Sequence, residues 1–179
     1  KRFTKSGKEI WLQAVYSPIK DVNGKVTKVI KIATDITEQK RETMNALALS
    51  NTVDNSYARI EFDVHGNILF ANQNFVNTLG YIKSAEIIGQ HHSLFIEALF
   101  AKSQEYRNFW SDLANGITQE GQFKRLQKDG TEIWIQAAYT PVKNEEGKVF
   151  KVIKIASNIT EQKRIALATE QAAAEVSRV

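Results

Sequence analysis

The chain has 179 residues, no cysteine, and a net charge of +4 from 24 Lys and Arg against 20 Asp and Glu. The lack of cysteine excludes disulfides, thiolate catalysis and cysteine-ligated metal centres. The basic residues form no run of five or six, so we expect a mixed polar surface and no nucleic-acid partner.

A segment at the start of the chain recurs 123 residues later. Residues 1–41 and 124–164 align without a gap and are identical at about two positions in three. Self-similarity of this kind predicts a tandem array. We expect the chain to begin part-way through its first unit, so that only the second unit, from about Tyr57, is complete. A domain of roughly 105 residues buries its own core, and a fragment of about 40 does not.

The first copy is predicted to hold strands followed by a helix. Residues 1–34 are rich in β-branched and aromatic residues between turn signals, which predicts a three-strand antiparallel meander. Residues 1–37 are therefore assigned to the C-terminal strands of a partial domain, and residues 38–56 to a linker helix.

The second copy begins with a strand, a turn and a strand, over residues 58–62 and 68–71. From residue 72 to residue 115 the apolar spacing becomes helical. Its clearest face carries Tyr106, Phe109, Trp110 and Leu113 at i, i+3, i+4 and i+7. Asn115-Gly116 then predicts a left-handed cap at the end of that helix.

A second meander follows, with strands predicted over residues 122–126, 132–142 and 149–157. Asp129-Gly130 supplies the first turn signal, and the loop that ends at Gly147 supplies the second. Two strands, several short helices and three strands predict an α+β domain over residues 57–160. Its helices are expected on one face of a five-stranded antiparallel sheet.

Each copy closes on the start of a helix. Asp35 and Asn158 each stand three residues before a glutamate, the spacing of a capping box. The exit helix over residues 161–179 carries Ile165, Thr169, Ala172, Val176 and Val179 at steps of four and three. This pattern favours either a short coiled-coil seam or an amphipathic helix that lies on its own domain.

Taken together, these motifs resemble the PAS family of sensory domains. The resemblance covers residues 57–164 in full and residues 1–41 as the last three strands of a second such domain. It rests on motifs that follow one another in the order typical of the family: Asp63-x-x-Gly66-Asn67, Leu79-Gly80-Tyr81, Glu86-Ile87-Ile88-Gly89, Lys128-Asp129-Gly130-Thr131 with Trp134, Gly147-Lys148, and Asn158-Ile159-Thr160. The closing Asn158 stands where the family usually has Asp, which Asp35 keeps.

More narrowly, residues 89–95, 106–110 and 123–125 look like the tandem PAS domains of soluble bacterial methyl-accepting chemotaxis transducers of the aerotaxis type. The resemblance implies a sensory and dimerisation module that senses a redox, oxygen or small-molecule cue. The module is expected to form a homodimer and to feed a coiled-coil signalling domain downstream in the same chain. Two alternatives are a ligand-free structural dimerisation module, and a PAS sensor of a histidine kinase or a diguanylate cyclase. No catalytic motif is present, so no enzyme is predicted.

The resemblance also implies two cofactor possibilities. His91 or His92 is a candidate ligand for the iron of haem b, because family members that bind haem use a histidine of this helical region. The alternative is a turn or cap role for both histidines. Flavin is the rival cofactor, and it would lie over the pocket-facing residues Ile135, Ala137, Tyr139 and Ala156. A filled core without any ligand is as plausible a prediction as either cofactor.

The outer face of the sheet is predicted to carry an apolar patch. Trp134, Ile153 and Ile155, with Trp11 in the first copy, are candidate interface residues. The alternative is that Trp134 packs only on its own flanking helix. Lys154 falls on the pocket side of its strand, where it either pairs with Glu61 or an anionic ligand, or reaches solvent at the edge of the sheet.

No apolar run approaches the roughly 18 residues that span a bilayer. We therefore expect no direct membrane insertion of this segment and a cytoplasmic location.

Overall fold

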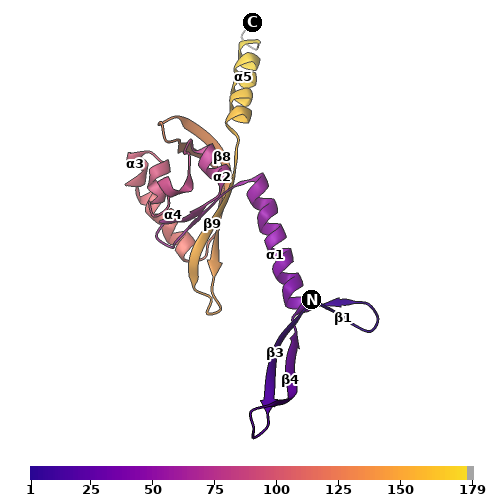
Figure 1. The fold of residues 1–179 in the computed structure, drawn as a ribbon. Coiled ribbons are helices and arrows are strands. Elements are labelled where there is room, and N and C mark those ends of the chain that lie inside the picture. Colours follow the sequence, from indigo (N-terminus) through magenta and orange to yellow (C-terminus); the bar gives the residue numbers. More distant parts are fainter. Residues whose placement is uncertain (177–179) are drawn as a thin grey trace. The chain divides into compact units, whose positions relative to one another are not determined.

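The computed structural model describes residues 1–176, which divide into two compact units, Lys1–Thr52 and the residues from Val53 onward. The second unit holds a five-stranded antiparallel sheet (Figure 1). Its strands lie side by side in the order β6-β5-β9-β8-β7, so β9 is central and β7 is an edge. Their bounds are β5 Ala58–Phe62, β6 Ile68–Ala71, β7 Gln119–Leu126, β8 Glu132–Lys143 and β9 Val149–Asn158. The predicted order of strands and helices along the chain and the five-stranded antiparallel sheet are confirmed.

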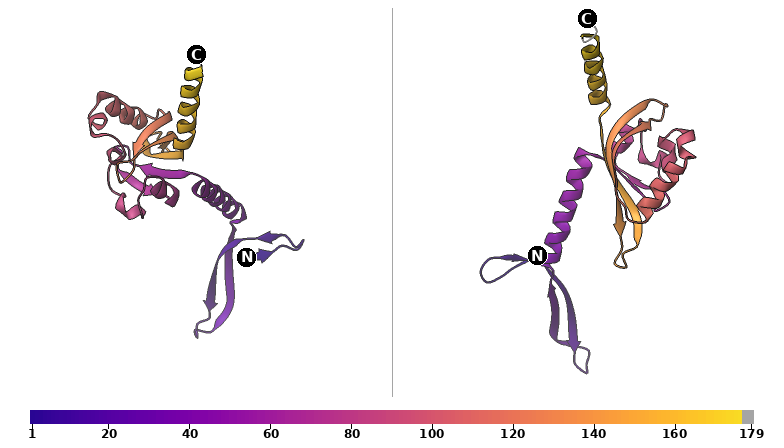
Figure 2. Two further views of the ribbon diagram at one scale, coloured as in Figure 1. Left: turned by 90° about the horizontal axis from the view of Figure 1, so that it is seen from above. Right: turned by 180° about the vertical axis from the view of Figure 1, so that it is seen from behind.

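Short helices between β6 and β7 cover one face of this sheet (Figure 2). They are α2 Gln73–Thr78, the 3-10 turns η1 Ser84–Glu86 and η2 His92–Phe95, α3 Ala98–Ala101 and α4 Gln104–Ala114. The predicted face of α4 is confirmed, since Tyr106, Trp110 and Leu113 are buried. Gly116, just after this helix, has φ +88°, in the left-handed region that its cap requires.

The core lies between the helices and the sheet, and β8 shows how the sequence determines it. Ile133, Ile135, Ala137 and Tyr139 are all buried, whereas Gln136 between them is exposed. Successive side chains of a strand point to opposite faces, so this alternation sets one side of β8 into the core. Ile135, Ala137 and Tyr139, which are predicted to face inward, therefore do so, and Ile133 joins them.

The exit helix α5 spans Thr160–Val176. Its side chains that the structure describes are exposed beyond the first turn, apart from half-buried Lys163. Ile165 and Leu167 are both more than half exposed. The hypothesis that this helix lies on its own domain is therefore wrong for the described residues. The side chain of Val176 and all of Val179, which belong to the predicted seam, lie outside them.

The first unit departs from its prediction. Instead of one three-strand meander it forms two separate hairpins, β1 Arg2–Phe3 with β2 Glu9–Ile10, and β3 Leu12–Lys20 with β4 Val26–Asp35. The strand equivalent to β8 is interrupted at Trp11. In the second unit a core packs against β8 and holds it in one sheet, whereas no residue of β3 or β4 is buried. The first copy lacks the tertiary packing that holds such a long strand together.

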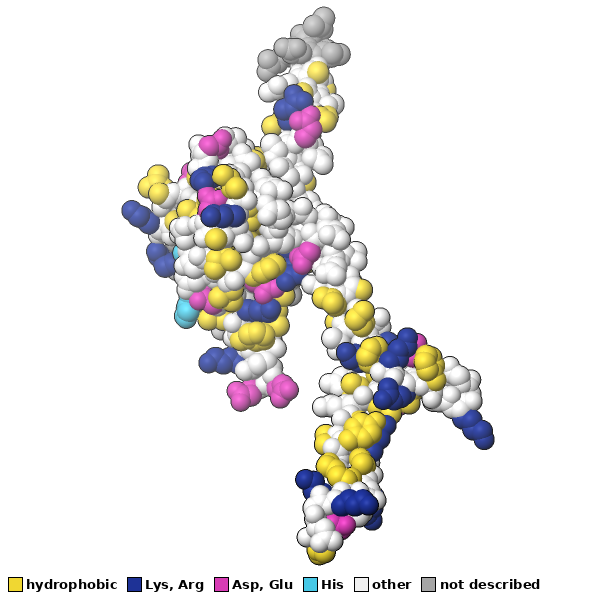
Figure 3. Space-filling model, viewed as in Figure 1, with side chains coloured by type: hydrophobic (Ala, Val, Ile, Leu, Met, Phe, Trp, Pro, Cys, Tyr) yellow, Lys and Arg dark blue, Asp and Glu magenta, His cyan; other side chains and the backbone are white. Residues whose placement is uncertain are grey.

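Apolar side chains consequently remain exposed on this hairpin (Figure 3). Val15, Val29 and Ile32 are each more than half exposed. Helix α1, Thr37–Ser56, follows β4 and buries none of its residues. Across the described residues, no helix combines the length and the apolar character needed to cross a membrane.

Candidate functional site

A chain of polar side chains runs through the aromatic core of the second unit. The two ring nitrogens of His92 lie 2.8 Å from the Tyr106 hydroxyl and 3.1 Å from the Tyr139 hydroxyl. Nη2 of Arg125 donates to the same Tyr139 hydroxyl at 3.0 Å. These bonds are all satisfied when Tyr139 donates to Nε2 of His92 and Nδ1–H of His92 donates to Tyr106. The four side chains form one network, and all four are buried.

The turn between β5 and β6 holds His92 in place. Its backbone N–H donates to the carbonyl of Gly66 at 2.8 Å. Gly66 has φ +89°, and a Cβ there would come within 2.8 Å of the His91 ring and 2.9 Å of the Trp110 ring. Only glycine satisfies both the turn geometry and this close approach. The Asp-x-x-Gly turn thus positions the central histidine of the network.

Helix α4 supplies the other end of the network. Ser103 caps it and accepts a hydrogen bond from the backbone N–H of Tyr106 at 3.1 Å. The Tyr106 ring stacks on the His92 ring, with centroids 5.8 Å apart and 17° between the planes. Phe62 meets His92 edge-on at 5.4 Å. Rings therefore enclose the imidazole, and water is kept from it.

This environment sets the protonation states. Burial depresses the pKa of His92 well below its usual 6.5, and the charges of Arg125 and Lys154 depress it further. Burial raises the pKa of Tyr106 to about 12. The pKa of Tyr139 is also raised by burial, against the effect of the Arg125 charge. The network is consequently a neutral imidazole between two neutral phenols, with a guanidinium at one end.

Lys154 is a second buried cation in the core, 1% exposed. The prediction that it reaches solvent at a strand edge is wrong, because β9 is the central strand and has no free edge. It does not pair with Glu61 either, since Glu61 binds Arg59 at 2.9 Å and Lys151 at 2.8 Å. Its ammonium instead lies over the Tyr139 ring, 4.8 Å from the centroid. Burial, followed by the charge of Arg125, depresses its pKa well below 10.5.

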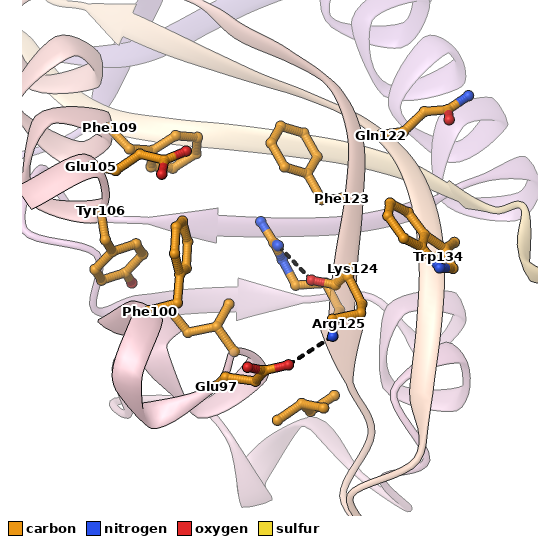
Figure 4. A pocket seen from close by; sticks show the side chains of 12 residues that line it. Glu97, Phe100, Glu105, Tyr106, Phe109, Gln122, Phe123, Lys124, Arg125 and Trp134 are labelled. Atoms are coloured by element: carbon orange, nitrogen blue, oxygen red, sulfur yellow. Dashed lines mark hydrogen bonds and ion pairs between the residues drawn. The ribbon is translucent and has the colours of Figure 1, made fainter. Parts of the chain in front are cut away.

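A pocket of about 370 Å³ opens between α3, α4 and the edge strand β7. Figure 4 shows aromatic rings around the space beside Arg125. Its walls combine five rings with charged and amide groups: Ile96, Glu97, Phe100, Glu105, Tyr106, Phe109, Gln122, Phe123, Lys124, Arg125, Leu126 and Trp134. Tyr106 and Arg125, the two ends of the buried network, therefore both border this pocket.

Trp134 links the pocket wall to the exit helix. Its backbone N–H donates to the Thr160 hydroxyl at 3.0 Å, and its carbonyl accepts from the N–H of Ile159 at 2.8 Å. The Asn158 side chain accepts from the N–H and the hydroxyl of Thr160, at 2.9 and 2.6 Å. Nζ of Lys163, one turn into α5, lies 4.9 Å from the centre of the Trp134 ring. We call this arrangement the strand–helix clamp.

The first unit contains the same clamp. The backbone N–H of Trp11 donates to the Thr37 hydroxyl at 2.9 Å, as that of Trp134 does to Thr160. The Asp35 side chain accepts from the N–H and the hydroxyl of Thr37, as Asn158 does from those of Thr160. The predicted capping boxes are wrong in both copies. The glutamate that would complete each box instead pairs with the arginine three residues later, as Glu161 does with Arg164 at 2.6 Å. The Asx–Thr contact starts the helix in place of a box.

Replacing Asn158 tests the clamp. Asn158→Ala removes the acceptor of both Thr160 donors, and we expect a loss of about 1 kcal/mol in the free energy of unfolding, the usual effect of losing a side-chain cap. Asn158→Asp should retain the wild-type value, because Asp35 makes the same two bonds in the first unit. Urea unfolding followed by circular dichroism measures both. Equal losses in the two variants would contradict this role for Asn158.

The two candidate haem ligands occupy different environments. His92 is buried with both ring nitrogens engaged by hydroxyl groups. His91 is half-buried and points the other way. Its Nδ1 accepts from the N–H of Ser93 at 3.1 Å, and its Nε2 lies 2.9 Å from the carbonyl oxygen of His65. As they lie, neither residue fits an iron ligand, and we derive no step through haem.

The candidate flavin residues line the core and not the pocket. Ile135, Ala137, Tyr139 and Ala156 are buried, and none of them borders the α3–α4–β7 pocket. The small side chains of the two alanines therefore do not open that pocket, and the flavin hypothesis gains no support from it.

On the outer face, Trp134, Ile153 and Ile155 are half-buried; Ile155 lies opposite Ala138 and Ile153 opposite Thr140, so Trp134 lies farther along β8 on the same face. Trp11 is 37% exposed in the first unit. Their role as an interface stays a prediction. The contact between Trp134 and Lys163 shows that the flanking helix packs on this tryptophan.

Sequence reasoning missed Arg125 and Tyr106 as site residues, because a basic residue on an edge strand ordinarily points to solvent. A signal was nevertheless present in the repeat. The network residues Arg125 and Tyr139, with Lys154, recur as Arg2, Tyr16 and Lys31. In the first unit Lys31 lies 5.2 Å from the centre of the Tyr16 ring. Both copies thus contain the same combination of one arginine, one tyrosine and one lysine.

Comparison with known proteins identifies a matching family and several relatives of the chain. A family model described as PAS domain matches residues 2–38 and 58–161. The biofilm dispersion protein BdlA of Pseudomonas aeruginosa is 38% identical over 167 residues, which is 92% of this chain and 39% of the relative. Phototropin-1A of Oryza sativa subsp. japonica is 31% identical over 86 residues, which is 48% of this chain and 9% of the relative. The chain therefore spans well under half the length of these relatives.

Solved structures agree on the fold. The PAS domain of a Colwellia psychrerythraea protein aligns with 65% of this chain and 98% of its own length, with a TM-score of 0.57 and 21% identity. An RNA-binding light-oxygen-voltage receptor covers 96% of this chain and 45% of its own length, with a TM-score of 0.61 and 19% identity. The sheet, its helical cover and the family match together show that this chain belongs to the PAS domain family of sensory modules.

Proposed function

We propose that the chain is the sensory and dimerisation module of a bacterial signal-transduction protein, of the kind that precedes the coiled coil of a methyl-accepting chemotaxis transducer. It is proposed to act without catalysis, in the cytoplasm, on a small-molecule cue. The similarity to a biofilm dispersion protein supports a signalling role over a purely structural one. A sensor that feeds a histidine kinase or a diguanylate cyclase is the alternative output.

The observation that carries the proposal is the double role of Trp134. Its side chain borders the pocket, and its backbone holds the start of α5 through Thr160 and Ile159. A molecule seated against this wall favours those positions of β8 that accommodate it. The helix that starts at Thr160 shares any such shift, because the clamp joins it directly to the strand. Binding of the molecule in the pocket thereby shifts the first turn of the exit helix.

Thr160→Val tests this coupling. Valine keeps the shape of threonine but removes the hydroxyl that accepts from Trp134. In the host bacterium, we expect full-length protein with Thr160→Val to lose most of the taxis or biofilm-release response that deletion of the gene abolishes. Thr169→Val is the matched control, because among the described residues the Thr169 hydroxyl bonds only to the carbonyl of Ile165 within α5. A wild-type response of the Thr160→Val strain would overturn the proposed coupling.

Dimerisation is proposed to use the outer face of the sheet. Trp134, Ile153 and Ile155 are half-buried apolar residues of that face, and aromatic residues are frequent anchors of interfaces. We expect Trp134→Ala to weaken the dimer at least tenfold in sedimentation equilibrium. Leu99→Ala, which removes an 85% exposed leucine from α3, should leave the dimer unchanged. An unaltered monomer–dimer balance in Trp134→Ala would exclude this face as the interface.

A further inference from the structure

The pocket between α3, α4 and β7 contains a buried cation without a carboxylate partner. Arg125 is 5% exposed, and its Nε has no hydrogen-bond partner within residues 1–176. Its hydrogen bonds are donations to the carbonyl of Lys124 at 2.7 Å and to the Tyr139 hydroxyl at 3.0 Å, and its guanidinium carbon lies 4.8 Å from the centre of the Phe123 ring. No ion pair in this part of the chain includes Arg125. A buried guanidinium is ordinarily paired, so this site lacks an anion.

Other basic side chains lie near Arg125 in the core and at the pocket. Lys154 lies in the same core and also has no ion-pair partner among the described residues. The charge of Arg125 contributes to the depressed pKa of both Lys154 and His92. The other basic residue of the pocket, Lys124, is already paired, since it binds Glu97 at 2.7 Å and Glu132 at 2.9 Å. Among the described residues, two charges at the pocket therefore have no ion-pair partner, Arg125 and Glu105, and of these Arg125 is buried whereas Glu105 is exposed.

The rest of the pocket is suited to a flat apolar body. Phe100, Tyr106, Phe109, Phe123 and Trp134 contribute rings to its walls. Figure 4 shows Phe100, Phe109 and Phe123 around the space beside the Arg125 guanidinium. Aromatic rings pack best on other aromatic rings, and a guanidinium binds a carboxylate through two parallel hydrogen bonds. A volume of about 370 Å³ is enough for one or two fused rings with an acid group.

We propose that this pocket binds a small aromatic carboxylate, with its rings among the pocket aromatics and its carboxylate on Arg125. The inference rests on the proposed sensory function and names the chemical class of the cue. Binding at Arg125 acts on the buried network, because Arg125 donates to the Tyr139 hydroxyl. Strand β8 carries both Tyr139 and Trp134, and it therefore joins this network to the clamp.

A matched pair of probes tests the charge requirement in the wild-type 179-residue chain. Isothermal titration calorimetry should show 2-naphthoate binding at least tenfold more tightly than 2-naphthalenemethanol, which has the same rings but no charge. Arg125→Met should abolish this preference, whereas Lys124→Met should retain it. Equal binding of the two probes, or no binding of 2-naphthoate up to 10 mM (about the weak limit of specific recognition), would overturn the inference.

A second variant provides an independent test of the charge requirement if Arg125→Met fails to fold. Glu105 lines the pocket and its side chain is exposed, so Glu105→Gln does not disturb the core. Removing this negative charge should strengthen binding of 2-naphthoate about two- to fivefold and leave the neutral alcohol unaffected. An unchanged or weaker affinity for 2-naphthoate would count against an anion in the pocket. Failure of these binding tests leaves the Thr160→Val signalling result intact, so the two proposals are separable.

Discussion

We expect His92→Leu to be the most destabilising of the substitutions considered, with a loss of about 2–4 kcal/mol in the free energy of unfolding at pH 7.5. Leucine fills much of the imidazole volume but bonds to neither phenol. The Tyr106 hydroxyl loses its partner at 2.8 Å, and the Tyr139 hydroxyl keeps only Arg125. Each buried polar group left unpaired costs roughly 1–3 kcal/mol. Urea denaturation at fixed pH measures the loss.

A double variant separates lost hydrogen bonds from lost packing. In His92→Leu/Tyr106→Phe the stranded Tyr106 hydroxyl is absent, so we expect about 1 kcal/mol to be regained over the single variant. If the double variant is as unstable as the sum of both single changes, the hydroxyl–imidazole bond contributes nothing. That result would contradict the network described here.

The pH dependence gives an independent check on His92. Its native pKa lies well below 6.5. Below pH 6.5 the unfolded chain binds a proton at His92 that the native state does not, so the wild type loses stability as the pH falls. His92→Leu lacks this contribution, and the difference between the two proteins should therefore shrink as the pH is lowered from 7.5 to 5, by at most about 2 kcal/mol. His65→Leu, in the exposed β5–β6 turn, is the control variant.

The second large effect has the opposite sign. We expect Lys154→Met to stabilise the chain at pH 7 by about 1–3 kcal/mol, because an apolar side chain of similar length replaces an unpaired buried amine. The melting temperature should rise by about 3–10 °C. Lys31→Met is the matched control, since Lys31 is the exposed counterpart in the first unit and its removal should change little. A lower melting temperature in Lys154→Met would mean that the contact with Tyr139 outweighs desolvation.

The pH trend of this variant follows from the same pKa. Between the depressed native pKa of Lys154 and 10.5, the unfolded chain holds a proton that the native chain does not. The free energy of unfolding of the wild type therefore rises with pH over this range, and the penalty disappears above 10.5. The advantage of Lys154→Met should consequently decrease as the pH is raised from 7 to 10.5 in calorimetric scans.

Local patterns in the sequence predicted much of this fold. Alternation in β8 identified the buried side of the strand from Ile133 to Tyr139. Spacing by three and four identified the buried face of α4, and Gly116 marked its end. These local patterns are confirmed because each one depends only on which side of a single strand or helix faces the core. The same reasoning could not find the polar network, whose members come from η2, α4, β7 and β8 and meet only in the folded domain.

Two predictions are wrong because they depend on contacts between residues that are far apart in the sequence. Lys154 was expected at solvent, and the position of β9 in the middle of the sheet prevents it. The first copy was expected to form one meander because its sequence matches the second so closely. A strand as long as β8 needs a core packed against it, and without one the equivalent strand is interrupted at Trp11. Near-identical sequences therefore adopt different sheets when their surroundings differ.

The duplicated clamp also bears on how such proteins change in evolution. Because Asp35-Ile36-Thr37 and Asn158-Ile159-Thr160 make the same bonds at the same point of the repeat, unequal recombination within the repeated coding sequence would join Asp35 directly to Ile159. The product lacks one whole module of 123 residues, yet its remaining strand still meets a helix through a complete set of contacts. Gain or loss of modules by this route requires no new junction, so the number of sensory units in a lineage is free to vary while the joint to the output stays the same.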